Sequence, residues 1–367
     1  MGTIARLGAG VLAAAVCAGT VVGSAAAVEW HGHDATQAVV DGFVRDGAPG
    51  AMVYARDRRA MWTVGAGTAE LGTQRPIRAR DRVRVASNTK MFTASVVLQL
   101  VAEGKVGLDD AIEEYLPGLV ASNGYDGRAI TVRQLLQHTS GMADYIADIL
   151  ADPAGADHPW APADLVHIGL SHPPLFAPGT GWGYSNTGYV VLGMLVESVT
   201  GKDIGTEITQ RLIEPLHLRD TSYPAAGDRR IPGPHAHGYY AFPGRPVADV
   251  TELEPSIPGA AAALISTGPD LTRFVRALLA GRVVPPGLLA QMRTTVPAQG
   301  PDYGLGIREI PLPCGGTAWG HAGDMPGFDS FTAATEDGRA AFVVVNGHLA
   351  DSSAAAVRTA VETALCE

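Results

Sequence analysis

Ser87 and Lys90 are spaced so that they can act together as a nucleophile and its base. They lie in Ser87-Asn88-Thr89-Lys90, where an apolar run predicts a helix over 91–103. Residues three apart share one helix face, so the Lys90 amine can lie beside the Ser87 hydroxyl. A lysine accepts a serine proton when burial or nearby positive charge lowers its pKa. The alternative is a serine that caps the helix and a solvated lysine, but lysine is scarce in this chain and opposes the helix dipole there.

A second polar element, Tyr184-Ser185-Asn186, directly precedes the apolar run that predicts a helix over 189–199. The Tyr184 phenol can relay a proton between Ser87, Lys90 and a leaving amine. The Asn186 carboxamide can hydrogen-bond a substrate amide. Taken alone, the same residues are also typical of an ordinary helix cap.

A third element, His321-Ala322-Gly323-Asp324, follows a predicted strand over 317–321. We expect Gly323 to let a substrate approach the strand backbone closely and bind along its edge as an added strand. The backbone N–H of Asp324, opposite that of Ser87, can then stabilise an oxyanion. For a lone histidine, the alternative is a hydrogen-bonded residue at a strand end.

Strand patterns occur at both ends of the chain, and helical patterns occupy the middle. The alternation of apolar and polar residues predicts strands over 51–56, 61–65, 304–310, 317–321, 330–335 and 341–346. Helices are predicted over 35–45, 91–103, 132–138, 189–199, 205–213 and 352–365. We therefore expect an α/β (α+β) fold with an antiparallel sheet built from both ends of the chain and flanked by helices. Two domains are predicted. One consists of residues 28–98 and 255–367 and carries the sheet, and the other is an inserted, mainly helical domain over 99–254.

Together the three elements resemble the motif triplet of the penicillin-recognising serine hydrolases, which include D-alanyl-D-alanine carboxypeptidases, class C β-lactamases and related esterases. The resemblance extends from about residue 50 to residue 366 and includes 130–141, 259–274 and 303–306. It is greatest to secreted Gram-positive D-alanyl-D-alanine carboxypeptidases. The β-lactamase/transpeptidase-like fold is the one that the resemblance implies.

The resemblance also implies a role for each motif residue. Ser87 is the acylated nucleophile, and Lys90 and Tyr184 share the proton transfers. Asn186 positions the substrate amide, and His321 shapes the electric field around Tyr184. Arg308 is a candidate for binding a terminal carboxylate through paired hydrogen bonds, or else a surface arginine.

The third motif departs from the carboxypeptidase pattern. Ala322 and Asp324 occupy positions where threonine hydroxyls usually help to hold a carboxylate. An anionic Asp324 facing the pocket would repel that carboxylate. This favours substrates that lack the carboxylate or carry a basic group instead.

The sequence therefore predicts a serine hydrolase that works through an acyl-enzyme on Ser87. The first substrate expected is the D-Ala-D-Ala end of a peptidoglycan stem peptide, with β-lactams as acylating inhibitors. The alternatives are a β-lactamase, or an esterase or D-aminopeptidase of the same fold. A non-catalytic cell-wall ligand binder or sensor has no need for Ser87, Lys90 and Tyr184 together.

Composition excludes other classes of protein. With 27 Lys+Arg against 37 Asp+Glu, the chain has a net charge of −10 and no basic run, so we expect no nucleic-acid partner. The histidine pairs at 31–33 and 235–237 lack the pattern of a ligand set, so no metal or cofactor is expected.

The amino terminus predicts export from the cytoplasm. Residues 1–27 combine one charge, an apolar run and a small-residue end, as in a cleaved signal peptide, so we expect a secreted protein without a stable membrane anchor. An uncleaved anchor is the alternative. Cys314 and Cys366 would then remain in an oxidising compartment, which permits one disulfide, although two buried free thiols are also consistent with the sequence.

Overall fold

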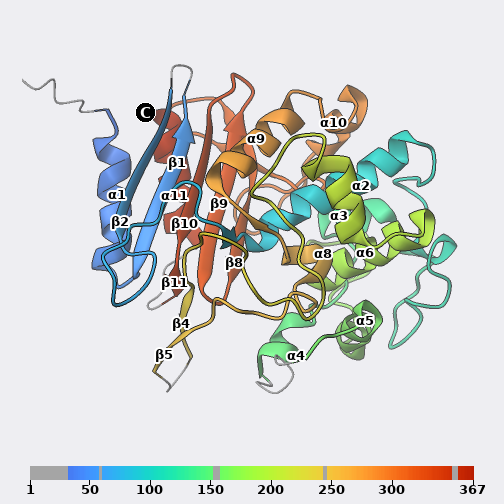
Figure 1. Cartoon of the computed structure of the whole chain (residues 1–367). Helices are drawn as coiled ribbons and strands as arrows, with labels where there is room; N and C mark the ends of the chain where they lie inside the picture. The colour runs from blue at the N-terminus through green and yellow to red at the C-terminus, as the bar shows by residue number, and fades with distance from the viewer. Residues whose placement is uncertain (1–31, 58–59, 152–157, 243–245, 349–353) are drawn as a thin grey trace, which may run out of the picture. The chain divides into compact units, whose positions relative to one another are not determined.

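A six-stranded antiparallel sheet joins the two ends of the chain (Figure 1). The computed structural model describes residues 32–57, 60–151, 158–242, 246–348 and 354–367. The sheet has the order β2-β1-β10-β9-β8-β7. Its strands are β1 (Gly50–Arg56), β2 (Met61–Gly67), β7 (Arg308–Pro311), β8 (Thr317–Met325), β9 (Phe328–Thr335) and β10 (Ala340–Val345). The predicted sheet built from both chain ends is confirmed.

Both faces of the sheet are covered, so its central strands are buried on both sides. Every residue of β9 and β10 is buried, whereas the residues of the edge strand β2 alternate between exposed and half-buried. The helices α1 (Asp34–Arg45) and α11 (Ala354–Cys366) pack on one face. On the other face α9 (Gly268–Leu279) packs on β1, β9 and β10, and the hydrophobic core there continues into the helical region.

The segment between β2 and β7 is mainly helical, as predicted. Its larger helices are α2 (Thr89–Ala102), α3 (Val132–Gln137), α4 (Ile146–Ala151), α5 (Pro162–Ser171), α6 (Asn186–Thr200), α7 (Ile204–Ile208) and α10 (Pro286–Met292). Shorter turns are η1 (Ala86–Asn88), η2 (Ile112–Glu114), the π-helical η4 (Thr209–Ile213) and the one-turn α8 (Gly259–Ala262). His33–Glu367 form one compact unit, so the division into 28–98 plus 255–367 and 99–254 stays a prediction.

Two small sheets lie outside the predicted set of strands. The strands β4 (Tyr239–Ala241), β5 (Val247–Asp249) and β11 (Gly347–His348) form one, and β3 (Val83–Arg84) with β6 (Ile265–Ser266) forms the other. The predicted strand over 304–310 is too long, because β7 begins only at Arg308. Gly306 has a φ of 75°, and the Gly304 N–H donates to the Ile307 carbonyl, so this stretch turns before it can pair.

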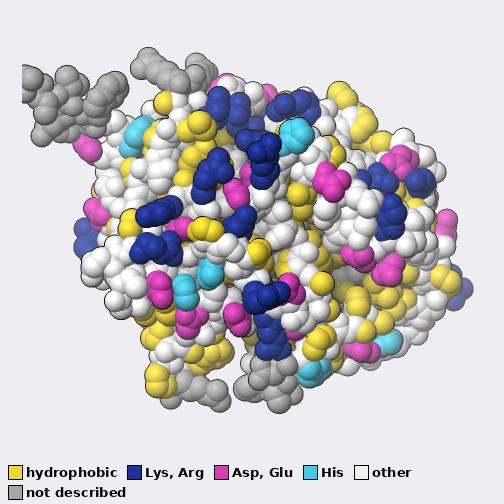
Figure 2. Space-filling view, in the orientation of Figure 1, with side chains coloured by type: hydrophobic (Ala, Val, Ile, Leu, Met, Phe, Trp, Pro, Cys, Tyr) yellow, Lys and Arg dark blue, Asp and Glu magenta, His cyan; other side chains and the backbone are white. Residues whose placement is uncertain are grey.

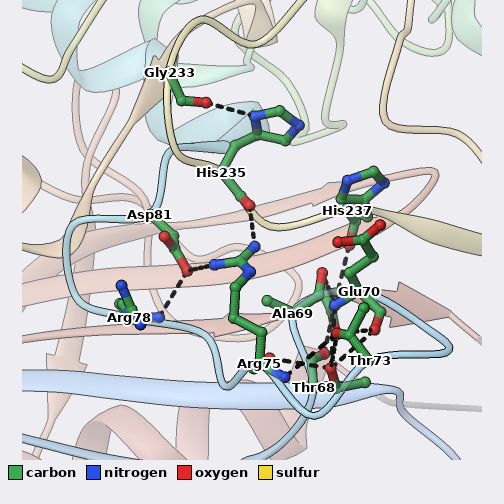
Figure 3. Close-up of polar contacts among 11 residues, drawn as sticks. Thr68, Ala69, Glu70, Thr73, Arg75, Arg78, Asp81, Gly233, His235 and His237 are labelled. Carbon is green, nitrogen blue, oxygen red and sulfur yellow. Dashed lines mark hydrogen bonds and ion pairs between the residues drawn. The ribbon is translucent and has the colours of Figure 1, made fainter.

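A polar network ties the loop before the nucleophile to the loop that carries the histidine pair (Figure 3). The Arg75 guanidinium contacts the Asp81 carboxylate at 2.7 Å and also donates to the His235 carbonyl. The His237 N–H donates to the Ala69 carbonyl at 2.8 Å, and its ring contacts Asp249 at 2.7 Å. These contacts give the pair a structural role, and no group of three potential metal ligands occurs among the described residues.

Cys314 and Cys366 form a disulfide with a Cα–Cα distance of 5.6 Å, so the permitted bridge is present. It links the turn between β7 and β8 to the end of α11. The predicted signal peptide over 1–27 lies outside the described residues. Within the described part of the chain, no helix is long and apolar enough to cross a membrane.

Reducing this disulfide is expected to destabilise the fold. The bridge closes a loop with a sequence separation of 52, for which the loop-entropy relation gives about 4 kcal/mol. Cys314→Ser and Cys366→Ser should lower the free energy of unfolding equally in denaturant titrations. Adding a reductant should destabilise the natural chain but neither variant. Equal stability with and without the bridge would contradict this.

Candidate active site

The backbone at Ser87 is held in a strained turn. Ala86, directly before it, has a φ of 47°, a value that residues other than glycine rarely adopt. Ser87 lies in η1, which runs straight into α2. The Asn88 amide anchors the turn by donating to the Val85 carbonyl and the Ser330 hydroxyl, each at 3.0 Å. The serine is thus presented at the start of a buried helix, as its sequence predicted.

Lys90 is fully buried beside Ser87. Its Nζ lies 3.0 Å from Ser87 Oγ, 2.7 Å from Asn186 Oδ1 and 3.1 Å from the Ala261 carbonyl. Burial lowers the pKa of Lys90 to about 7, against the opposing effect of the Asp144 carboxylate. A neutral amine has two N–H groups and one lone pair. With Asn186 and Ala261 accepting the N–H groups, the lone pair can receive the Ser87 proton.

Asp144 fixes the orientation of Asn186. Its Oδ2 accepts from Asn186 Nδ2 at 2.8 Å and from the Asn186 backbone N–H at 3.1 Å, while its Oδ1 accepts from the Ile146 N–H at 3.0 Å. Since Nδ2 is held by the carboxylate, Oδ1 must point to Lys90. Asp144 was not among the residues selected from the sequence, because 42 residues separate it from Asn186.

Tyr184 completes the group around the serine. Its side chain lines the same cavity as Ser87, and Lys90 Nζ lies 4.6 Å from the centre of its ring. Burial raises the pKa of Tyr184 well above its usual value, with the neighbouring Tyr303 adding to the effect. The phenol therefore keeps its proton near neutral pH, where it can act as a donor.

His138 supports the turn that carries Tyr184. It ends α3 with a φ of 62°, its carbonyl accepts from the Gly183 N–H at 2.9 Å, and its Nδ1 accepts from the Ser185 N–H at 3.2 Å. Its ring lies 4.3 Å from that of Tyr184. The stretch 130–141 had shown its family resemblance in the sequence, but not this contact.

The side chain of His321 is hydrogen-bonded to Tyr303 and not to Tyr184. Its Nε2 lies 2.8 Å from the Tyr303 hydroxyl, and its Nδ1 is hydrogen-bonded to the Ala322 carbonyl. Burial lowers the pKa of His321 well below its usual value, and Arg308 and Lys90 lower it further. The ring is therefore neutral, with Nδ1 as donor and Nε2 as acceptor from Tyr303.

Gly323 allows a close contact within the protein, besides its predicted role in substrate approach. A Cβ at this position would lie 2.2 Å from the Val85 carbonyl and 2.9 Å from Asn88 Nδ2. The glycine therefore lets β8 pack closely against the nucleophile turn. The substrate-facing edge of β8 is nevertheless open, because β7 pairs with it only as far as Gly320, opposite Arg308.

Ala322 and Asp324 lie on the opposite face of β8 from His321 and Gly323, because side chains alternate along a strand. Ala322 packs against the core under α1 and α11 and also lines the cavity next to Ser87. Asp324 is exposed and lines the cavity next to Ser87. Its carboxylate is therefore exposed at the cavity.

A cavity of about 610 Å³ opens next to Ser87. One Arg308 nitrogen, Nη1, donates to the carbonyls of Gln299 and Pro301, and its guanidinium lies over the Tyr303 ring at 4.9 Å. Polar residues that line the cavity are Ser87, Asp144, Tyr184, Asn186, Glu254, Arg308, His321 and Asp324. Apolar residues that line it include Ile146, Ile149, Leu150, Leu253, Ile257 and Met325. The structure thus gathers the predicted residues at one cavity, with Lys90 and Gly323 behind its wall.

A serine with a buried lysine and a protonated tyrosine, held between an antiparallel sheet and a helical layer, defines a serine hydrolase of the β-lactamase fold. The sequence profile of the Beta-lactamase family matches residues 36–364. The chain belongs to this family.

Two solved structures resemble the chain along most of its length. A D-stereospecific amidohydrolase from Streptomyces sp. is 42% identical with a TM-score of 0.82, over 90% of this chain and 98% of that one. The D-amino acid amidase from Ochrobactrum anthropi SV3, complexed with L-phenylalanine amide, is 28% identical with a TM-score of 0.79. The match covers 90% of this chain and 96% of the amidase chain.

A curated relative matches over a shorter length. Penicillin-binding protein 4* of Bacillus subtilis (strain 168) is 33% identical over 181 residues, which make up 48% of this chain and 37% of the relative. The chain thus spans less than half the length of this relative.

Replacing Asp144 with asparagine tests the Lys90–Asn186–Asp144 arrangement. Because the Asp144 charge raises the pKa of Lys90, its loss should shift the acidic limb of the pH–rate profile, expected near pH 7, to lower pH. Loss of hydrogen bonds to a charged group should also lower kcat/KM about tenfold or more. Asp41→Asn, which removes an exposed carboxylate on α1, is the matched control. An unshifted limb in Asp144→Asn would contradict the arrangement.

Proposed function

We propose that the protein is a D-stereospecific amidohydrolase that hydrolyses amides of apolar D-amino acids through an acyl-enzyme on Ser87. The observation that carries the proposal is the lining of the cavity beside the serine. Its wall of isoleucine, leucine and methionine side chains suits a large apolar substituent next to the scissile carbonyl.

The charges around the cavity favour a substrate with a free amino group. Three carboxylates, those of Asp144, Glu254 and Asp324, line it together with the single guanidinium of Arg308. Glu254 is ion-paired with Arg229 at 3.4 Å and Asp144 is hydrogen-bonded to Asn186, so Asp324 presents the exposed negative charge. An ammonium group is attracted to such a surface, and a carboxylate is repelled. The D stereochemistry is supported by the similarity to the Streptomyces amidohydrolase and the Ochrobactrum amidase.

The proposed reaction begins with proton transfer from Ser87 to the lone pair of neutral Lys90. Ser87 Oγ forms a bond to the amide carbon, and the resulting oxyanion accepts hydrogen bonds from the backbone N–H groups of Ser87 and Asp324. Tyr184 donates its proton to the leaving nitrogen as the C–N bond breaks, and Lys90 returns a proton to Tyr184. Water then attacks the acyl ester and gives one proton to the same pair of residues. The pair returns this proton to Ser87 Oγ as the ester C–O bond breaks, which releases the amino acid and free Ser87.

A D-alanyl-D-alanine carboxypeptidase acting on peptidoglycan stem peptides is the second candidate. Arg308 favours it, since its guanidinium lines the cavity and can bind a terminal carboxylate. Against it, Arg308 Nη1 is already held by two loop carbonyls, and Ala322 and Asp324 supply no hydroxyl.

A panel of substrates separates the two candidates. D-Phenylalanine amide should be hydrolysed at least a hundredfold faster, in kcat/KM, than its L enantiomer. The kcat/KM for N-acetyl-D-phenylalanine amide should be at least tenfold lower than for D-phenylalanine amide, because acetylation removes the ammonium charge that the cavity carboxylates attract. If an N-acylated D-Ala-D-Ala peptide is instead the best substrate, the carboxypeptidase assignment replaces this proposal. The p-nitrophenyl ester of D-phenylalanine tests ester hydrolysis.

Acylation of Ser87 can be followed by intact mass after incubation with benzylpenicillin. The similarity to a penicillin-binding protein supports an adduct with this acylating β-lactam. We expect it in the natural chain and not in Ser87→Ala. An adduct that persists supports a penicillin-binding enzyme. An adduct that is rapidly hydrolysed, with return of the unmodified mass, indicates a β-lactamase. Substrate binding without turnover or adduct, in a folded protein, would indicate a non-catalytic binder.

A further inference from the structure

A second cavity, of about 550 Å³, lies behind the wall of the catalytic one. The segment 254–262, which includes α8, separates the two. Pro255, Ser256, Gly259 and Ala260 line the second cavity, whereas Glu254, Ile257, Pro258 and Ala262 line the catalytic cavity. An occupant of the second cavity would rest against the same one-turn helix whose Ala261 carbonyl holds Lys90 at 3.1 Å.

The floor of the second cavity is apolar. It is formed by side chains of α6 and α7, which pack around the helical core: Val190, Met194 and Ile204. Gly205 keeps this floor close to Tyr223, because a Cβ there would lie 2.5 Å from the tyrosine ring. The Tyr223 hydroxyl has no hydrogen-bond partner within the described part of the chain, so it is available to a ligand.

The rim of the second cavity is acidic. Glu197, Asp203 and Glu214 line it, and no lysine or arginine does so among the described residues. Asp203 caps α7 by accepting from the Thr206 N–H at 2.9 Å. Glu197 and Glu214 are exposed, and neither side chain has an ion-pair or hydrogen-bond partner in the described ranges. Burial and the Asp203 charge raise the pKa of Tyr223, so its hydroxyl stays neutral.

We propose that this cavity is a binding site for a small apolar primary amine, separate from the catalytic site. The hydrocarbon part would pack against Val190 and Met194, and the ammonium group would lie at Glu197 and Glu214. Charge complementarity selects this class of ligand. An apolar anion would bring its charge to three carboxylates, and a neutral hydrocarbon would leave the rim and the Tyr223 hydroxyl unpaired.

The experiment titrates 2-phenylethylamine into the full chain and follows binding by calorimetry or ligand-observed NMR, without turnover. The anion 3-phenylpropionate, which carries the same phenylethyl group, is the control ligand. We expect saturable binding of the amine and none of the anion. Absence of saturable amine binding, or equal binding of the anion, overturns the proposal.

Three variants assign the amine to one cavity. The double variant Glu197→Gln/Glu214→Gln should weaken binding at least fivefold, and Met194→Trp should abolish it by filling the cavity. Asp324→Asn, which removes an exposed carboxylate at the catalytic cavity, should leave it unchanged. The opposite pattern would place the amine in the catalytic cavity and overturn the proposal. If Met194→Trp does not fold, the double variant Glu197→Gln/Glu214→Gln decides, because both of these side chains are exposed. Because no turnover is measured, failure here is distinct from failure of the proposed hydrolase activity.

Discussion

The burial of the Lys90 amine is the constraint on which the active site depends. An ammonium group has no lone pair and cannot accept a serine proton. Burial lowers the pKa of Lys90 to about 7, so that the neutral amine is present near neutral pH. Such a group is tolerated only where its polar atoms find partners. Here Ser87, Asn186 and the Ala261 carbonyl supply them. The site therefore needs two partners from distant parts of the chain before it has any chemistry.

The sheet and the helical layer bring those partners together because each contributes one wall. The nucleophile turn packs against β8 at Gly323, and the turn before α6 is held by His138 and Asp144. The strain at Ala86 is maintained by buried hydrogen bonds from Asn88 on one side and by α2 on the other. A local backbone cost is thus offset by contacts throughout the core.

The surface view shows how charge is distributed over the molecule (Figure 2). Lysine and arginine side chains gather over the face that carries α9 and the end of β1, although the chain has a net charge of −10. The two cavities differ from this face, since carboxylates outnumber basic groups in the lining of both. Within one acidic protein, the fold therefore separates regions with opposite charge preferences.

The sequence by itself determined what depends on neighbours along the chain. Spacing placed Ser87 beside Lys90 at the start of a helix, and the strand patterns at both ends of the chain predicted the antiparallel sheet. The three motifs also identified Tyr184, Asn186 and His321, which the fold brings to one cavity.

Only the tertiary structure decided which distant groups complete the site. Asp144 lies 42 residues from Asn186 and Ala261 lies 171 residues from Lys90, so no local pattern links them. It also showed that 304–307 turns instead of forming a strand, which brings Tyr303 beneath His321. Gly323 illustrates the difference. The sequence showed a glycine in the third motif, but only the fold showed that a side chain at this position would collide with the Val85 carbonyl. Hydrogen bonds and burial join groups by distance in space, and that distance exists only once the chain has folded.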